Sequence, residues 1–181
     1  PVGGNNITND IAIGLRVPFD VAEDLKRQCG HALPEAVDPD ETIDVRSFGQ
    51  GPARVVSRQQ LATIIEARAE EMFEMVLREV KRSGYDGLLA AGVVLTGGTA
   101  ELPGLVELGQ RIMGMPVRIG MPSDLQGLAD AVRGPAYATG VGMLLWGLRH
   151  DSEPRQAPGT EGLGGDGFRK FLSWLKEFLP R

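Results

Sequence analysis

The sequence predicts an α/β fold in which short buried strands alternate with helices. Residues 93–104 indicate it most strongly, because three aliphatic residues lead into the pair Gly97 and Gly98 and then into a new helix start. Residues 58–83 carry a long amphipathic helical pattern, and residues 117–119 are typical of another short strand. A strand, a glycine turn and a helix N-terminus together form the usual edge of a nucleotide pocket in an open α/β sheet. A plain strand-to-helix turn uses the same residues, so this segment alone leaves both interpretations open.

Composition limits the classes of protein that fit. The 181 residues suffice for one good core or two small subdomains. A hydrophobic content of 42% and a charged content of 24% are ordinary for a soluble globular protein, and the net charge of -5 argues against nucleic-acid binding. The single cysteine, Cys29, excludes an internal disulfide and fits a reducing compartment. No apolar run is long enough to span a bilayer, and no signal peptide is recognised. Because the chain starts at Pro1, we expect it to be a piece of a longer protein.

Two helices are expected near the N-terminus. The first follows the glycine pair at residues 3–4, with Thr8 as its N-cap and one apolar face. That face consists of Ile11, Ala12 and Leu15. Pro18 begins the second helix, since the first turn tolerates a missing N–H, and Gly30 ends it.

A hairpin and a long helix are expected next. Residues 42–46 alternate as a strand does, and residues 54–56 pair back as a second strand. Ser57 and Gln60 have the spacing of a capping box, which predicts a helix from there to about residue 83. Its apolar stripe consists of Leu61, Ile65, Met72, Phe73, Val76, Leu77 and Val80.

The following segments continue the alternation of strands and helices. Residues 93–95 predict a strand, residues 105–113 a helix and residues 117–119 a second strand. Residues 124–132 predict a short helix. Residues 136–148 predict a helix rich in small side chains, which permits close packing against another backbone.

The C-terminal residues differ in character from the rest. Residues 151–167 hold five glycines and two prolines, which predicts a flexible linker. Residues 168–181 predict a short amphipathic helix with a charge of +3. Its apolar arc consists of Phe168, Phe171, Leu172, Trp174, Leu175, Phe178 and Leu179, and its polar face carries the basic residues Arg169, Lys170 and Lys176.

An aromatic apolar face beside a basic polar face is typical of a helix that lies in a membrane interface. Ordering the helix offsets part of the gain from burial, so we expect weak and reversible binding. Anionic lipid should add about 1 kcal/mol per basic residue near the surface. A helix that docks on the protein's own core and a helix that enters a partner's groove are the alternatives. The linker argues against the first, because a docking helix seldom needs a long glycine-rich tether.

Three segments and the tail together resemble one known family. Residues 1–12, 92–104 and 135–142, combined with the amphipathic tail, make the chain similar to the C-terminal part of the FtsA family. Members of this family are actin-like bacterial cell-division proteins that link the FtsZ ring to the membrane. The resemblance covers nearly all 181 residues, and the tail distinguishes this family from other actin-like proteins.

The resemblance implies an actin-like (ribonuclease-H-like) α/β fold, of which the chain would be the second half only. Residues 1–15 and 83–150 would form a larger nucleotide-binding subdomain, and residues 16–82 a smaller inserted subdomain. Residues 151–167 would be a flexible linker, and residues 168–181 an amphipathic membrane-targeting helix.

The resemblance also implies ATP as the cofactor. The residues that it places at the nucleotide are Glu23, Lys26, Gly97, Gly98, Thr99, Gly3 and Gly4. Glu23 would accept hydrogen bonds from the ribose hydroxyls, and the stem of Lys26 would pack on adenine. From the spacing alone, a solvated i,i+3 charge pair is the alternative. Gly97 and Gly98 would lie beside the adenosine, and Thr99 would follow at the turn. Gly3 and Gly4 would lie near the phosphates.

The resemblance assigns no catalytic residue and no metal ligand to this chain. The phosphate loops, the acidic catalytic residues and the magnesium-binding positions of the family would lie before Pro1, so magnesium is expected from the missing half of the cleft. His31 and His150 are each isolated from other ligand types, which supports no further metal site. We expect at most a weak ATPase that acts mainly by binding and polymerising.

Partners are implied in the same way. The C-terminal peptide of FtsZ would dock on residues 16–82, with Arg68 or Arg58 paired to a peptide carboxylate. An ordinary solvated arginine is the alternative at both positions. Self-association into filaments and attachment to lipid would place the protein at the division site, on the cytoplasmic face of the inner membrane. No nucleic-acid partner is expected.

Other functions are consistent with parts of the sequence. The first is another actin-like ATPase module, of the pilus-assembly or chaperone type, which should not need this tail. The second is a sugar or acetate kinase of the same superfamily, which would show phosphoryl transfer. The third is an interaction domain that has lost its nucleotide, and nucleotide binding would separate it from the others.

Overall fold

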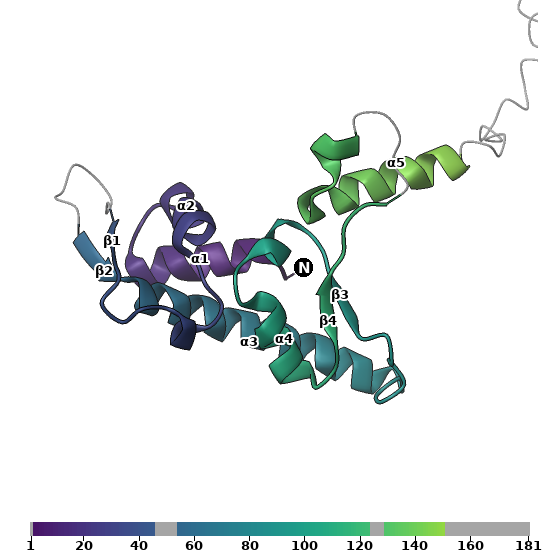
Figure 1. The fold of residues 1–181 in the computed structure, drawn as a ribbon, viewed down its shortest axis with the longest axis horizontal. Coiled ribbons are helices and arrows are strands. Elements are labelled where there is room, and N and C mark those ends of the chain that lie inside the picture. The colour runs from purple at the N-terminus through teal and green to yellow at the C-terminus, as the bar shows by residue number, and fades with distance from the viewer. Residues whose placement is uncertain (1, 46–53, 124–128, 151–181) are drawn as a thin grey trace, which may run out of the picture. The chain divides into compact units, whose positions relative to one another are not determined.

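The computed structural model describes three ranges of the chain, residues 2–45, 54–123 and 129–150 (Figure 1). Contacts divide the chain into two units, Pro1–Met143 and Leu144–Arg181, and each is described by itself. The predicted linker and the predicted membrane-targeting helix, with all the lipid-facing residues assigned to it, lie outside the described residues.

Helix α1 (Gly4–Leu15) begins earlier than predicted. Gly3 is its N-cap, and the N–H of Gly3 donates to the side-chain oxygen of Asn6 at 2.9 Å. The prediction that Thr8 caps this helix is therefore wrong. Thr8 lies inside the helix on its buried face, because the glycine start has already begun the turn that a threonine cap would otherwise begin. The other buried residues of α1 are Ile7, Ile11 and Leu15.

Helix α2 (Phe19–Cys29) confirms the second predicted helix, with Pro18 as its N-cap. Gly30 caps its C-terminus in an extended conformation rather than a left-handed one. A Cβ at Gly30 would lie 2.2 Å from the carbonyl oxygen of Lys26, so the close approach of the backbone is what requires glycine there. The loop after α2 contains the short 3-10 helix η1 (Pro34–Ala36).

Strands β1 (Thr42–Val45) and β2 (Arg54–Ser57) pair antiparallel, which confirms the predicted hairpin. Helix α3 (Arg58–Arg82) follows β2 directly and ends before Gly84, whose φ of +78° suits a glycine stop. Ser57 is the N-cap of α3, but its side chain makes no capping hydrogen bond. The helix start is confirmed, whereas the predicted capping box does not form.

The predicted apolar stripe of α3 is buried only in its first half. Leu61, Ile65 and Phe73 lie in the core, whereas Val76 is 45% exposed. Helices α1 and α4 (Leu105–Met113) both pack against α3. Periodicity predicts which face of a helix is apolar, but neighbouring elements determine how much of that face is covered.

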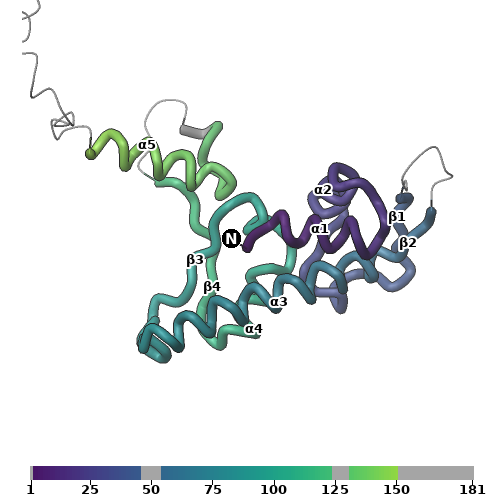
Figure 2. Tube along the Cα trace, turned by 180° about the vertical axis from the view of Figure 1, so that it is seen from behind, coloured from purple at the N-terminus to yellow at the C-terminus, as the bar shows by residue number. Residues whose placement is uncertain are grey.

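Strand β3 (Val93–Leu95) pairs in parallel with β4 (Val117–Ile119), as Figure 2 shows from behind. Parallel strands need a crossover connection. Here the crossover consists of the 3-10 helix η2 (Gly98–Glu101) and α4. Strands β3 and β4 and the helix α4 between them confirm the α/β alternation that the sequence predicts.

One hydrophobic core joins most elements of the first unit. Its buried members are Ile7, Ile11, Leu15, Val17, Ala22, Ala32, Val45, Val56, Leu61, Ile65, Ala69, Phe73, Leu102, Leu105, Leu108 and Met113. These residues come from both of the implied subdomains. The division into residues 1–15 with 83–150 and residues 16–82 therefore stays a prediction.

Helix α5 (Ala138–His150) confirms the last predicted helix of the folded body and follows the 3-10 helix η4 (Pro135–Tyr137). The described part of the predicted helix at 124–132 is the 3-10 helix η3 (Ala129–Val132). A Cβ at Gly140 or Gly142 would meet no described atom within 4 Å. The predicted close packing of this helix is therefore not found among the described residues.

The described part of the second unit is residues 144–150, the last turns of α5. The Trp146 ring stacks on the His150 ring, with centroids 4.3 Å apart. Within the three described ranges, none of the helices has both the length and the apolar character that crossing a bilayer requires.

Candidate functional site

A polar cavity of about 550 Å³ lies in the first unit. Its walls come from the start of α1, the middle of α2, the η2 turn with the two residues after it, and η4. Among the residues that line it are Gly4, Glu23, Lys26, Gly98 and Thr99. The family resemblance places these five residues at one nucleotide site, although they lie far apart along the chain. The structure brings them together, and their roles stay a prediction.

Helix α2 presents Glu23 and Lys26 on one face, one turn apart. The Lys26 ammonium lies 2.5 Å from Glu23 Oε2. Lys26 is only 7% exposed, so the pair is not the solvated surface pair that was the alternative interpretation. A buried ammonium needs partners for its N–H groups, and the surroundings of Lys26 supply them.

Four residues form a cluster around this ammonium, which we call the Lys26 cluster: Gly4, Thr8, Glu23 and Lys26. Besides the bond to Glu23, Lys26 Nζ donates to Thr8 Oγ1 at 2.8 Å and to the carbonyl oxygen of Gly4 at 3.3 Å. The Thr8 hydroxyl donates to Glu23 Oε2 at 2.5 Å. Thr8 was not predicted as a site residue, because its part in the cluster depends on how α1 packs against α2.

The cluster changes the acidity of its carboxyl group. Partial burial raises the pKa of Glu23, but the hydrogen bonds from Lys26 and Thr8 and the positive charges of Lys26 and Arg27 outweigh that effect. The pKa of Glu23 therefore lies below its ordinary value of 4.5. The side chain is a carboxylate at neutral pH, which is the form that accepts hydrogen bonds from hydroxyl groups.

The glycine turn after β3 forms the opposite wall of the polar cavity. Gly97 has a φ of +90°, which side chains rarely adopt, and its N–H donates to the carbonyl oxygen of Pro135 at 2.9 Å. A Cβ at Gly4 would lie 2.0 Å from the Thr99 hydroxyl oxygen. Only glycine at the start of α1 therefore allows this helix to approach the turn so closely.

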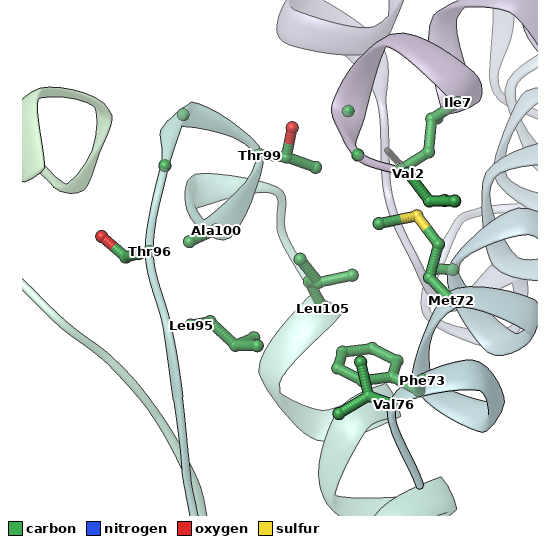
Figure 3. A pocket seen from close by; sticks show the side chains of 15 residues that line it. Val2, Ile7, Met72, Phe73, Val76, Leu95, Thr96, Thr99, Ala100 and Leu105 are labelled. Atoms are coloured by element: carbon green, nitrogen blue, oxygen red, sulfur yellow. The ribbon is translucent and has the colours of Figure 1, made fainter. Parts of the chain in front are cut away.

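A second cavity, of about 310 Å³, borders the same turn and shares Gly4, Gly98 and Thr99 with the polar cavity (Figure 3). Leu95 and Leu105 line it on one side, and Met72, Phe73 and Val76 on the other. The remaining predicted nucleotide residues, Gly3 and Gly97, line this apolar cavity. They are not among the residues that line the polar one.

The described residues offer no ligand set for a metal ion. In residues 2–45, 54–123 and 129–150, no three His, Cys, Asp or Glu side chains gather closely enough to hold a cation. Magnesium commonly binds through one or two carboxylates together with the phosphates of a nucleotide. The magnesium ion expected from the missing half of the cleft stays a prediction.

The two arginines predicted to bind a partner make ion pairs within the chain. Arg68 forms a two-pronged pair with Asp10 of α1, and its third nitrogen lies 2.5 Å from Glu71. Arg58 NH1 donates to both oxygens of Glu41, at 2.9 and 2.7 Å, and its Nε donates to a backbone carbonyl. About a quarter of each arginine side chain is exposed. Their role toward a partner stays a prediction.

The sequence matches a known family over most of its length. The model of the family "Cell division protein FtsA" matches residues 1–142. FtsA of Pseudomonas aeruginosa is 48% identical over 153 residues, which cover 84% of this chain and 37% of the relative. FtsA of Neisseria meningitidis is 39% identical over 183 residues, covering 99% and 44%, and FtsA of Bacillus subtilis is 40% identical over 150 residues, covering 83% and 33%. The chain therefore spans less than half the length of these relatives.

Solved structures support the predicted fold. MreB5 of Spiroplasma citri bound to ADP superposes with a TM-score of 0.57 at 15% identity, over 84% of this chain and 46% of that chain. The same protein bound to AMPPNP gives a TM-score of 0.56 at 16% identity. At this identity the likeness establishes the fold alone. The predicted actin-like α/β fold is confirmed, and the C-terminal amphipathic helix stays a prediction.

Proposed function

Because the chain belongs to the family of the cell division protein FtsA, we propose that it is part of a nucleotide-binding adaptor that tethers the FtsZ ring to the membrane. ATP would bind in the polar cavity. Self-association into filaments would let many weak membrane anchors act together, which converts weak single contacts into firm attachment. The protein would work at the division site, on the cytoplasmic face of the inner membrane.

One observation carries the nucleotide part of this proposal. Glu23, Lys26, Gly98 and Thr99, which the family resemblance assigns to the nucleotide, line one polar cavity together with Gly4, whereas Gly97 lines the adjoining apolar cavity. There the Glu23 carboxylate would accept from ribose hydroxyls, and the aliphatic stem of Lys26 would contact the base. Gly98 would leave room for the ligand to lie against the backbone. Nucleotide-bound neighbours of the same fold are consistent with this assignment.

An ATP titration tests the assignment of the nucleotide site to the polar cavity. The complete product of the gene is titrated with ATP, first as the wild type and then as Glu23→Gln. We expect Glu23→Gln to weaken ATP binding about tenfold, because a charge-assisted hydrogen bond is replaced by a neutral one. Glu74→Gln is the matched control, since Glu74 is an exposed carboxylate on α3. Equal affinity of all three proteins would contradict the assignment, and no ATP binding by the wild type would favour an interaction domain without nucleotide.

The membrane part rests on the sequence of residues 168–181, whose aromatic and basic pattern is typical of an interfacial helix. Removal of these residues should abolish co-sedimentation with liposomes that contain anionic lipid. Unchanged pelleting of the truncated protein would refute the tether. A substitution of Lys170 and Lys176 by glutamine is a milder variant, and it should weaken pelleting more at low salt than at high salt.

The FtsA family match argues against the alternatives drawn from the wider superfamily. A pilus-assembly or chaperone module and a sugar or acetate kinase would be expected to match their own families over residues 1–142 rather than this one. Phosphoryl transfer to a small substrate is therefore not part of the proposal, and ATP hydrolysis would be weak at most.

A further inference from the structure

Thr8 is fully buried at the point where α1 meets α2, and its hydroxyl contacts both charged members of the Lys26 cluster. Its oxygen accepts from Lys26 Nζ at 2.8 Å, and its hydroxyl has two acceptors within reach, Glu23 Oε2 at 2.5 Å and the Gly4 carbonyl oxygen at 3.2 Å, of which the carboxylate is the nearer. A threonine hydroxyl is one of the few side-chain groups that can donate and accept at the same time. Thr8 therefore connects the ammonium to the carboxylate.

The hydrogen bonds of Lys26 account for all of its donors. An ammonium has three N–H groups. Here they reach Thr8 Oγ1, Glu23 Oε2 and the carbonyl oxygen of Gly4. Lys26 thus keeps no donor for a ligand, and its charge serves to hold Glu23 and the first turn of α1 in place.

The hydrogen bonds of Glu23 are divided unequally between its two oxygens. Oε2 accepts from both Lys26 and Thr8. Both hydrogen bonds that Glu23 accepts within the Lys26 cluster go to Oε2, and neither goes to Oε1. Because Glu23 lines the polar cavity and about a third of its side chain is exposed, the second oxygen is the acceptor that remains for a ligand.

We propose that Thr8 is a positioning residue of the nucleotide site, which together with Lys26 fixes the Glu23 carboxylate so that its second oxygen is presented to the ribose hydroxyls. This inference rests on the nucleotide binding proposed above. Without the Thr8 hydroxyl, Lys26 loses one partner, and the carboxylate loses the donor that determines its rotation. The site would then still bind the phosphates and the base, but it would bind the ribose hydroxyls weakly.

The experiment measures ribose discrimination on the complete product of the gene. Dissociation constants are determined for ATP and for 2′,3′-dideoxy-ATP, which lacks both ribose hydroxyls. The variants are Thr8→Val, which keeps the shape and removes the hydroxyl, and Thr8→Ser, which keeps the hydroxyl. Thr63→Val is the matched control, because Thr63 is an exposed α3 threonine whose hydroxyl bonds only its own helix, at 2.9 Å.

We expect the wild type, Thr8→Ser and Thr63→Val to prefer ATP about tenfold, the usual size of a lost hydrogen bond to a charged group. Thr8→Val should reduce this preference to less than about twofold, while its affinity for the dideoxy nucleotide changes little. A purely structural role would weaken both nucleotides equally and leave the ratio unchanged. If Thr8→Val does not fold, Thr8→Cys takes its place in the same measurement, because cysteine has a side chain of similar size and a weaker donor. A reduced preference for ATP in Thr8→Cys would then support the inference, and an unchanged preference would overturn it.

The outcomes separate this inference from the function on which it rests. A wild type that binds ATP and discriminates, together with a Thr8→Val variant of the same ratio, overturns the role of Thr8 and leaves the nucleotide site standing. A wild type that binds neither nucleotide refutes the nucleotide site, and the inference with it. A Glu23→Gln variant that has lost discrimination and loses no more when Thr8→Val is added supports the inference, because the two residues then act as one unit.

Discussion

The Lys26 cluster and a second cluster on the surface each hold a cation at a similar distance from a carboxylate, yet their surroundings differ. In the Lys26 cluster the ammonium is 7% exposed and lies 2.5 Å from Glu23. In what we call the Arg111 cluster (Arg111, Glu35, Glu66 and Glu70), the Arg111 guanidinium lies 2.8 Å from Glu35 and 2.7 Å from Glu66, but 49% of its side chain is exposed. The Arg111 cluster ties α4 to α3 and η1 across the surface, whereas the Lys26 cluster borders a cavity.

The difference indicates which charges matter for function. Solvent already stabilises the exposed Arg111, so its ion pairs contribute little. Lys26 has given up most of its hydration, so each of its three protein partners replaces water, and loss of any one of them exposes an unpaired buried group. Short ion-pair distances alone do not distinguish the two clusters, whereas burial beside a polar cavity makes the Lys26 cluster the candidate for function.

The largest effect is expected for removal of the buried cation. Lys26→Met should lower the free energy of unfolding by about 2–4 kcal/mol, because Glu23 and Thr8 lose their common partner. Urea titration of the variant beside the wild type measures it. Lys81→Met is the matched control, since Lys81 is exposed in the last turn of α3, and it should change stability by less than about 0.5 kcal/mol. Equal losses of stability in Lys26→Met and Lys81→Met would show that the burial of Lys26 does not govern its contribution.

An intermediate effect is expected at Arg68, whose side chain is 26% exposed and lies between the two extremes. Asp10→Asn and Arg68→Gln each break the ion pair between α1 and α3, and each should lower the free energy of unfolding by less than Lys26→Met does. Only Arg68→Gln removes a cation that an acidic peptide could bind. A weaker affinity for the FtsZ C-terminal peptide in Arg68→Gln alone would support the partner role, whereas equal affinities in both variants would make Arg68 purely structural.

A smaller effect is expected from acid, and its sign follows from the lowered pKa of Glu23. A carboxyl group whose pKa is lowered by folding stabilises the protein above its ordinary pKa of 4.5, and that stability is lost as the pH falls through the lower folded-state value. Glu23→Gln should therefore melt below the wild type at pH 7, and the gap should close in strong acid. Thermal melts of both proteins from pH 7 to pH 3 check this, and a gap that stays constant over the range would contradict the lowered pKa.

The smallest effect is expected for the exposed cluster. Arg111→Met should lower the free energy of unfolding only slightly, although it removes several ion pairs, because all of them face solvent. The small loss should shrink further in 0.5 M salt, which screens exposed charges more than buried ones. A loss as large as that of Lys26→Met would show that exposure does not govern these clusters.

Much of the fold could be predicted because its signals are local. The 25-residue helix α3 follows from apolar spacing, and the β3–α4–β4 unit follows from short aliphatic runs separated by a glycine turn and a helical pattern. Helix starts were less predictable. Thr8 and Ser57 both have the chemistry of an N-cap, but only Ser57 stands at a helix start, and its hydroxyl makes no cap bond there.

The site itself was partly predictable. Glu23, Lys26 and the glycine turn were recognised together because their spacing and context resemble a family pattern. Arg68 and Arg58 were recognised only as basic residues, since nothing in the sequence indicates that Asp10 and Glu41 lie beside them. Thr8 was missed as a site residue for the same reason, because its partners are 15 and 18 positions away along the chain.

The order of elements, the apolar faces of the helices and the pattern that identifies the family are properties of the sequence by itself, because each arises from residues within a few turns of one another. The burial of Lys26, the place of Thr8 between two charges, and the approach of Gly4 to Thr99 were decided only when α1, α2 and the η2 turn packed together. Hydrogen bonds and desolvation act over a few ångströms in space, so they depend on contacts that the order of residues does not state.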